Sequence, residues 1–110
     1  YWKLTRLGDD PVVLSENQRE PHLVLHSEGR RVSGFGGCNN FNGNFAVEGQ
    51  EIAFGHLATT AMACPHSEDV ELPFMVALAE ASTFRLMPHH LEIFDEAGQM
   101  VARFEARELE

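Results

Sequence analysis

The sequence is poor in basic side chains. Eight lysines and arginines stand against seventeen aspartates and glutamates in 110 residues, which gives a formal net charge of −9. Nucleic-acid binding depends on lysine and arginine to neutralise phosphates, and membrane-surface helices are also basic, so this balance argues against both. No apolar run in the sequence approaches the roughly 18 residues of a membrane span. We therefore expect no nucleic-acid partner and no membrane insertion by this domain.

The sequence also lacks the motifs of common catalytic and metal sites. It contains no Gly-x-Ser-x-Gly, no His-Glu-x-x-His, no Walker-type loop and no Cys-x-x-Cys pair. We predict no catalytic residue, no metal and no cofactor. Two alternatives stay open. One is a metal- or redox-active module that uses Cys38, Cys64 and the nearby His56 and His66, and the other is an enzyme of unrecognised type, for instance with Cys38, His56 and Asp95.

Two histidines four residues apart, His22 and His26, are the obvious pair for a shared metal ion. On a helix they would lie on one face, but Pro21 before them and the Leu-Val-Leu run between them favour a strand. A four-residue step along a strand spans about 13 Å, too far for two ligands that each lie about 2 Å from one ion. We predict that this pair alone does not chelate.

Length and composition indicate one globular domain, residues 1–110. Hydrophobic residues make up 44% and charged residues 23% of the chain, which is ordinary for such a domain. Most of the acidic excess lies in residues 56–110, which hold ten acidic and three basic side chains. A basic partner could use that excess, although an acidic surface also serves solubility.

Alternating apolar and polar residues predict short strands through most of the chain. The first covers Trp2–Leu7 and ends in a turn over residues 8–11. Leu23 and Leu25 lie on one face of the next strand, which returns after a turn at 27–30. Hairpin connections predict antiparallel pairing. The further strands are expected at 32–35, 45–47, 52–54, 57–60, 83–87, 91–94 and 100–105, where Val101 and Phe104 are expected to pack inward.

One segment, about 67–82, is predicted to be a helix. Ser67 is a suitable N-cap, and an apolar stripe follows at helical spacing through Phe74 and Leu78. Pro73 either bends the first turns or occupies the first position of a later start. The fold class is therefore α+β, mainly β: a curved antiparallel sheet or open barrel of about eight short strands, with the helix packed against it.

Two linked segments hold the only two cysteines. The first is Gly34-Phe35-Gly36-Gly37-Cys38-Asn39-Asn40-Phe41-Asn42-Gly43, and the second is Thr60-Ala61-Met62-Ala63-Cys64. Glycine and asparagine favour positive φ or close backbone approach, so the first segment is predicted to be a demanding turn rather than a plain strand. Its amides could instead line a ligand site, but we favour the structural role.

The order of these features resembles the META/HslJ-like family of bacterial domains. The residues that carry the resemblance are Gly34, Gly37, Cys38, Asn39, Phe41, Gly43, Thr60, Met62 and Cys64, followed by an acid-bearing helix around 71–78. The resemblance implies a location in the periplasm, the cell envelope or the medium. Members often occur as lipoproteins, some linked to heat shock, antibiotic tolerance or secretion. No established set of catalytic residues comes with the family.

In an oxidising compartment Cys38 and Cys64 can form a disulfide; two buried free thiols are the alternative. We expect a non-enzymatic binding or structural, stress-related module with an unknown protein or small-molecule partner. A deep apolar cavity would favour a small-molecule carrier, and a filled core would favour a protein partner. The envelope or secreted location that the resemblance implies is compatible with a signal peptide or a lipid anchor upstream of Tyr1, which the sequence from Tyr1 onward does not decide.

Overall fold

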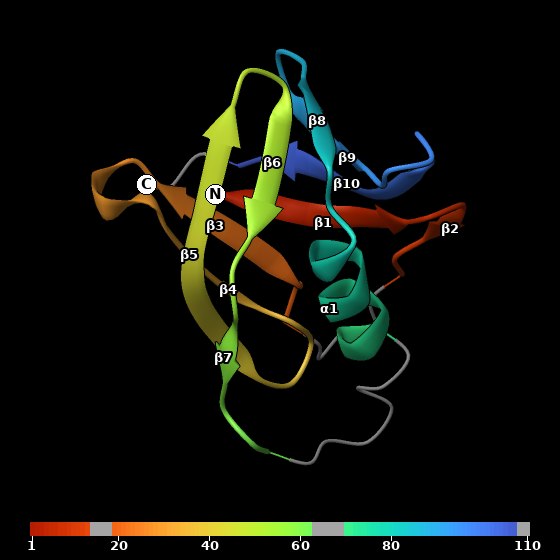
Figure 1. Ribbon diagram of the computed structural model, residues 1–110. Helices are drawn as coiled ribbons and strands as arrows, with labels where there is room; N and C mark the ends of the chain where they lie inside the picture. The colour runs from red at the N-terminus through yellow and green to blue at the C-terminus, as the bar shows by residue number, and fades with distance from the viewer. Residues whose placement is uncertain (14–18, 63–69, 108–110) are drawn as a thin grey trace.

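Antiparallel strands close into a barrel with one α-helix across its lower opening (Figure 1). The structure is a computed structural model that describes residues 1–13, 19–62 and 70–107. The closed path runs β1-β3-β4-β5-β6-β8-β9-β10 and returns to β1. The strands on this path are β1 (Trp2–Leu7), β3 (His22–His26), β4 (Arg31–Phe35), β5 (Asn40–Glu48), β6 (Glu51–Phe54), β8 (Thr83–Leu86), β9 (His90–Phe94) and β10 (Met100–Ala106).

The predicted fold class is confirmed, and the pairing of β1 with β10 closes the barrel. Two-residue strands extend it: β2 (Asp10–Pro11) pairs with β1, and β7 (Ala58–Thr59) pairs with β5. A short 3-10 turn, η1 (Glu28–Arg30), joins β3 to β4. Residues 10–11, which were expected to belong to the turn after β1, form the edge strand β2 instead. A proline is tolerated in this edge strand because no further strand pairs with it and needs an N–H group there.

The barrel interior is filled by aromatic and aliphatic side chains. Phe41 of β5 and Phe74 of the helix meet edge to face at 5.6 Å between ring centroids, and Phe104 of β10 lies 5.9 Å from Phe74. All three rings are at most 1% exposed. The other buried side chains of this core are Leu4, Leu23, Val32, Ala77, Leu78, Leu91, Ile93 and Ala102. The described residues thus form a filled core.

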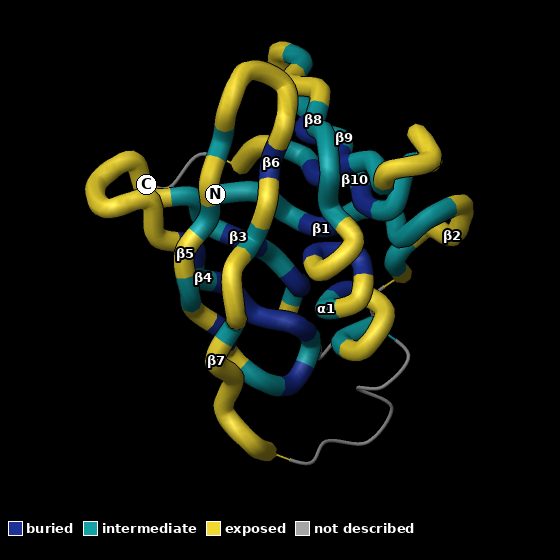
Figure 2. Tube along the Cα trace, in the orientation of Figure 1, coloured by how far each residue is buried: buried dark blue, intermediate teal, exposed yellow. Residues whose placement is uncertain are grey.

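The helix α1 (Glu71–Ala79) ends three residues before the predicted limit of 82, and the expected cap Ser67 lies outside the described residues. Pro73 is its third residue. The first four N–H groups of a helix have no partner within the helix, so a proline there removes no hydrogen bond. α1 buries Phe74 and Leu78 against the barrel but leaves Leu72 64% exposed. Figure 2 shows that exposed residues alternate with buried ones along α1.

The prediction of a turn is wrong for most of the glycine- and asparagine-rich segment. β4 continues to Phe35 and β5 begins at Asn40, so only residues 36–39 lie outside the strands. Side chains alternate along β5, with Phe41 buried and the asparagines at 40, 42 and 44 exposed. A Cβ at Gly34 would overlap the Phe41 ring, and one at Gly43 would lie 2.7 Å from a backbone carbonyl oxygen. These strand glycines allow close approach.

Register shifts mark two bulges in the wall next to α1. In β1 the shift falls between Leu4 and Arg6, which leaves Thr5 as the extra residue. In β10 it falls between Met100 and Ala102. As a result Ala102 is fully buried, whereas Val101, which was expected to face inward, is only partly buried beside the core.

Candidate functional site

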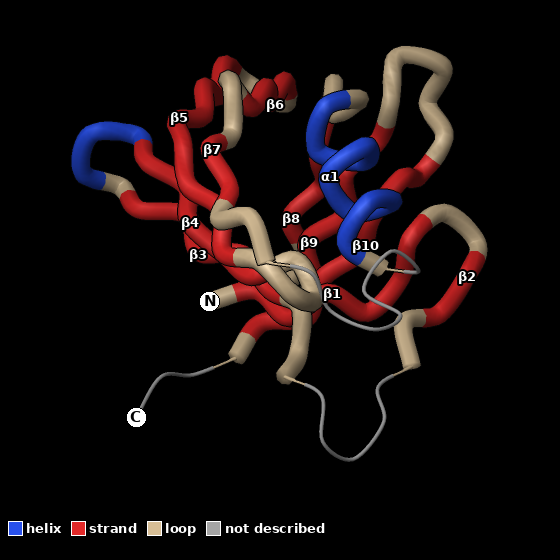
Figure 3. The backbone as a smooth tube through the Cα atoms, turned by 90° about the horizontal axis from the view of Figure 1, so that it is seen from below, coloured by secondary structure: helices blue, strands red, loops and turns tan. Residues whose placement is uncertain are grey.

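Three separate parts of the chain meet at one end of the barrel, and we call this cluster the motif joint. It consists of the turn at residues 36–39, the segment at residues 60–62, and Glu71 at the start of α1. The turn is closed by a bond from the Gly36 N–H to the Asn39 carbonyl oxygen at 2.9 Å. Figure 3, seen from below, shows α1 beside the loop that contains this turn.

Asn39 is the centre of the motif joint because its amide uses its full hydrogen-bonding capacity. Its Nδ2 donates to the Met62 carbonyl oxygen at 3.1 Å and to Glu71 Oε2 at 2.9 Å. Its Oδ1 accepts from the Thr60 hydroxyl at 2.9 Å and from the Met62 N–H at 2.6 Å. Two donors and two lone pairs are all that a primary amide offers. No other polar side chain of this size could replace asparagine without losing bonds.

The Glu71 carboxylate holds the turn against the helix. Its Oε1 accepts the backbone N–H groups of Cys38 at 3.2 Å and Asn39 at 2.5 Å. A carboxylate also favours the first turn of a helix, where the helix dipole is positive. Gly36 makes room for it, because a Cβ there would lie 2.9 Å from the Glu71 side chain. Gly37 supplies a φ of +127°, which side-chain-bearing residues rarely adopt.

The structure brings most of the predicted motif residues together. Cys38 is buried, and its Sγ lies 3.5 Å from the Met62 carbonyl oxygen. The Thr60 hydroxyl also accepts the Asn40 N–H at 3.1 Å. Phe41 belongs to the core, and Gly34 and Gly43 pack in the strands. Cys64 lies outside the described residues, so its disulfide with Cys38 stays a prediction.

Sequence reasoning missed the role of Glu71. An acidic residue in the first turn of a helix is common, so the sequence alone identifies Glu71 only as part of the family pattern. The signal that could have revealed it is the neighbouring pair Gly36 and Gly37, which leaves backbone N–H groups free and uncrowded for an anionic acceptor. The geometry makes the motif joint a structural device, because each polar group at its centre is already bonded within the protein.

The candidate metal ligands and acids that the structure describes make separate contacts. His22 and His26 lie on β3 as predicted; their ring nitrogens contact the Glu20 carbonyl oxygen and the Ser33 hydroxyl, each at 3.0 Å. Asp95 accepts two N–H groups of its own turn. His56 is exposed and His66 lies outside the described residues. In the described part of the chain, no group of three His, Cys, Asp or Glu could hold a metal ion.

Tyr1 forms a small polar cluster on the outer wall. Its ring stacks on His22 at 4.4 Å between centroids, and its hydroxyl donates to Glu20 Oε2 at 2.9 Å. Burial, and then the hydrogen bond to the Glu20 carboxylate, raise the pKa of Tyr1 to about 12. A neutral phenol with so high a pKa does not suit acid–base chemistry near neutral pH.

An apolar surface lies beside the motif joint, and we call it the α1 face. It consists of the exposed Leu72 and Val76 together with a groove of about 250 Å³ between α1, β1 and β10. Leu72 and Val76 are four residues apart, so they lie one above the other on the helix. The groove is lined by Leu7, Gly8, Pro73, Val76, Ala77, Glu80 and Val101.

Acidic residues lie in and near the α1 face. Glu80 lines the groove itself, and a second hollow of about 440 Å³ at the end of α1 is lined by Glu80, Asp95 and Glu96 among alanines. Asp9 and Asp10 are exposed and directly follow Gly8, which lines the groove. Among the described residues, Arg6 bonds to this rim: its Nη2 donates to the Asp9 carbonyl oxygen at 2.8 Å.

Within the described residues, no helix is long and apolar enough to cross a membrane. Fold and motif joint together define a class: a small filled β-barrel in which a Gly-Gly-Cys-Asn turn is bonded to a carboxylate of the plugging helix. The family model that describes the META domain matches residues 1–108. The chain therefore belongs to the META domain family. Comparison with curated proteins found no match.

Solved structures with the same fold include three at low sequence identity. A protein from Burkholderia xenovorans solved by NMR has a TM-score of 0.74 at 24% identity, over 97% of this chain and 81% of that one. A second NMR structure has a TM-score of 0.70 at 24% identity, over 94% and 86%. The crystal structure of a DUF4847 family protein from Bacteroides vulgatus has 0.61 at 14%, over 82% and 61%. At such identities the likeness concerns the fold alone.

Proposed function

We propose that this META domain is a non-enzymatic binding module of the cell envelope or the secreted fraction, and that it docks a basic amphipathic protein segment on the α1 face. The observation that carries the proposal is the exposure of Leu72 and Val76 above an apolar groove. α1 is apolar on both sides, and helices of that kind are normally covered on both sides. One side of α1 packs on the barrel core, and the other has no cover from the described residues.

The size of the groove supports a protein segment rather than a small molecule. Pockets for drug-sized ligands usually measure about 300–1,000 Å³ and enclose most of the ligand. The groove at α1 measures about 250 Å³ and opens onto the outer side of the helix. A space of this size accepts one or two apolar side chains of a partner, as in helix-in-groove recognition.

The charges around the groove indicate the kind of partner. Glu80 lines it, Asp95 and Glu96 line the neighbouring hollow that shares Glu80, and the exposed Asp9 and Asp10 follow the lining residue Gly8 in the chain. A second copy of this chain would bring the same acidic rim and a net charge of −9 against it. Like charges across an interface disfavour association, whereas opposite charges speed and orient it. A segment with apolar residues on one side and lysine or arginine on the other fits both features.

Titration with a synthetic helical peptide tests this proposal. The probe is an amphipathic leucine–lysine peptide, and its partner probe has every lysine replaced by glutamate. We expect the lysine peptide to bind and the glutamate peptide to fail. Burial of one leucine contributes about 1.5–3 kcal/mol, so Leu72→Ser combined with Val76→Ser should weaken binding at least tenfold.

Leu86 provides the matched control, because it is 61% exposed at the end of β8, away from the helix. Leu86→Ser removes the same exposed side chain and should leave the affinity unchanged. Equal binding by the helix variant and the native chain would refute the proposed site. A concentration-dependent dimer that is lost in the Val76→Ser chain would also refute it, because the face would then be covered by a second copy.

A further inference from the structure

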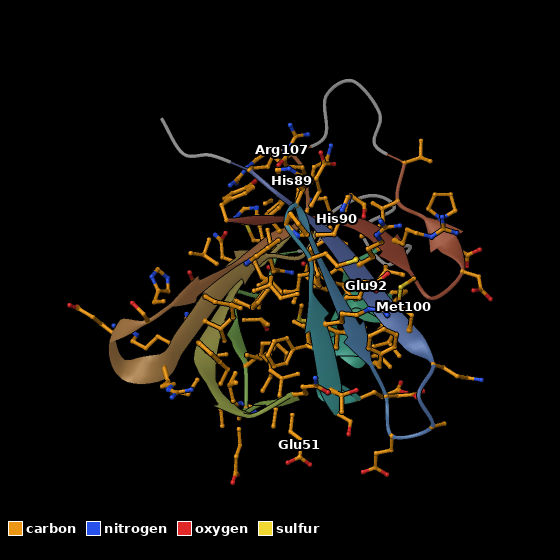
Figure 4. The ribbon with its side chains drawn as sticks, turned by 90° about the horizontal axis from the view of Figure 1, so that it is seen from above. Glu51, His89, His90, Glu92, Met100 and Arg107 are labelled. Atoms are coloured by element: carbon orange, nitrogen blue, oxygen red, sulfur yellow. The ribbon has the colours of Figure 1, made fainter. Side chains whose placement is uncertain are left out.

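Three arginines share one row on the outer wall of the barrel, away from the motif joint. In the strand register Arg85 lies opposite Glu92, Glu92 lies opposite Arg103, and Arg103 lies opposite Arg6. This arginine row therefore crosses β8, β9, β10 and β1. The residues on either side of Arg103 are fully buried, so the row faces outward. Figure 4 labels Glu92, which lies between Arg85 and Arg103 in the row.

The bulge in β1 is what places Arg6 in the row. Leu4 lies opposite Phe104, and a regular strand would then set Thr5 opposite Arg103 and turn Arg6 toward the interior. The extra residue instead brings Arg6 opposite Arg103 and turns it outward. The Thr5 hydroxyl donates to the Arg103 carbonyl oxygen at 3.1 Å and fixes the bulge. Bulges often re-aim a side chain at a functional position.

The row contains one carboxylate for three guanidinium groups. Arg85 uses Nε and Nη2 on Glu92 Oε1 at 3.1 and 2.9 Å. Arg103 Nε lies 3.9 Å from Glu92 Oε2, and among the described residues this buried atom has no hydrogen-bond partner. Within the part of the chain that the structure describes, Arg6 bonds a backbone carbonyl oxygen and no carboxylate. Like charges directly opposite on neighbouring strands are destabilising, so the pair Arg103 and Arg6 lacks an anion.

We propose that the arginine row binds an oxyanion, a phosphate or carboxylate group of a small ligand, between Arg103 and Arg6. Side chains directly opposite on neighbouring strands have Cβ atoms about 4.5–5.5 Å apart, so two guanidinium groups can close on one oxyanion. The planar fork of arginine matches the oxygens of both groups. Glu92 holds Arg85 and leaves Arg103 only partly neutralised. The row shares no residue with the α1 face as defined above.

NMR of the arginine Nε–H signals in the 15N-labelled chain tests the proposal. Sodium phosphate, sodium acetate and sodium chloride are titrated separately at constant ionic strength. We expect phosphate or acetate to shift the Arg6 and Arg103 signals with saturation, and chloride to give no saturable shift. A response to phosphate alone assigns a phosphate-bearing ligand, a response to acetate alone a carboxylate-bearing one, and both responses support an oxyanion site.

Two variants distinguish a specific anion-binding site from general electrostatic screening by the added salt. Arg6→Gln removes one charge-assisted donor and should weaken anion binding about tenfold. Arg103→Gln should weaken anion binding to the same extent. If the Arg103→Gln chain is unstable, Arg6→Gln still tests the proposal. Arg31→Gln is the control, because Arg31 is exposed on β4 and lies outside the row. The proposal is wrong if phosphate and acetate produce no saturable shift, if Arg31 responds equally, or if Arg6→Gln binds as tightly as the native chain.

Discussion

Replacement of Asn39 by aspartate keeps the shape of the side chain and removes both of its donors. The Met62 carbonyl oxygen and the Glu71 carboxylate then lose the hydrogen bonds that they accept at 3.1 and 2.9 Å. A neutral hydrogen bond contributes about 1 kcal/mol net and one to a charged group about 1.5–3 kcal/mol. A new negative charge beside Glu71 adds repulsion. We expect Asn39→Asp to lower the free energy of unfolding by roughly 3–4 kcal/mol at pH 7.

The assay is urea or thermal unfolding followed by circular dichroism, with Asn42→Asp as the control. Asn42 is an exposed residue of the same strand region, so the same substitution there should change stability by no more than about 0.5 kcal/mol. For a domain of this size, 1 kcal/mol corresponds to about 4 °C in Tm, so we expect a loss of roughly 12–16 °C for Asn39→Asp.

The pH dependence of the stability of the Asn39→Asp chain provides a second test. The introduced carboxylate faces Glu71 without donors of its own, so its folded-state pKa lies above the unfolded value. The folded state then binds more protons than the unfolded state, and stability falls as pH rises through that interval. The defect should therefore be smaller near pH 4 than at pH 7. If Asn39→Asp is no more damaging than Asn42→Asp at pH 7, the reasoning on the motif joint is refuted.

Further predictions concern the wall, the core and the cysteines. Tyr1 is the only tyrosine, so near-ultraviolet titration should show half-ionisation at about pH 12 instead of 10.0, and Glu20→Gln should lower that midpoint. Because the folded-state pKa is raised, the contribution of Tyr1 to stability is present below pH 10.0 and is lost as pH rises toward 12; a midpoint at the ordinary value would contradict the assigned hydrogen bond. Phe74→Ala should cost about 3–5 kcal/mol in chemical unfolding, and a loss below about 1 kcal/mol would show that the core is not filled as described. Thiol alkylation of unreduced protein should add no mass, and reduction should lower stability by up to about 3.5 kcal/mol, if Cys38 and Cys64 are paired; two added alkyl groups would show free thiols.

Much of the fold follows from local patterns in the sequence. The alternation in Trp2–Leu7 and the helical spacing of Phe74 and Leu78 identify their elements, because burial on one face imposes the period. The turn prediction is wrong for the asparagine-rich start of β5 because it follows the glycine and asparagine content. The two-residue alternation that places Phe41 and Phe45 on one face of a strand is the signal that holds. Closure of the barrel joins Trp2 to Ala106, and no local signal reports a pairing between distant segments.

The candidate site was only partly accessible to sequence reasoning. The motif pattern grouped Asn39 with Thr60 and Met62, but the role of Glu71 depends on which helix end meets which turn. Likewise the sequence assigned one apolar stripe to the helix and left Leu72 unexplained. Its exposure became visible only when the packing of α1 on the barrel was known.

In this protein the motif joint contributes stability and the α1 face is the proposed binding surface, and a comparison of two variants separates these roles. Peptide affinity and unfolding free energy are measured together for Thr60→Ala and for the chain with Leu72→Ser and Val76→Ser. The account predicts that Thr60→Ala unfolds about 1–2 kcal/mol more easily and binds the lysine peptide normally, whereas the helix variant keeps its stability and loses affinity. Loss of peptide affinity by Thr60→Ala in fully folded protein, with binding intact in the helix variant, would contradict it.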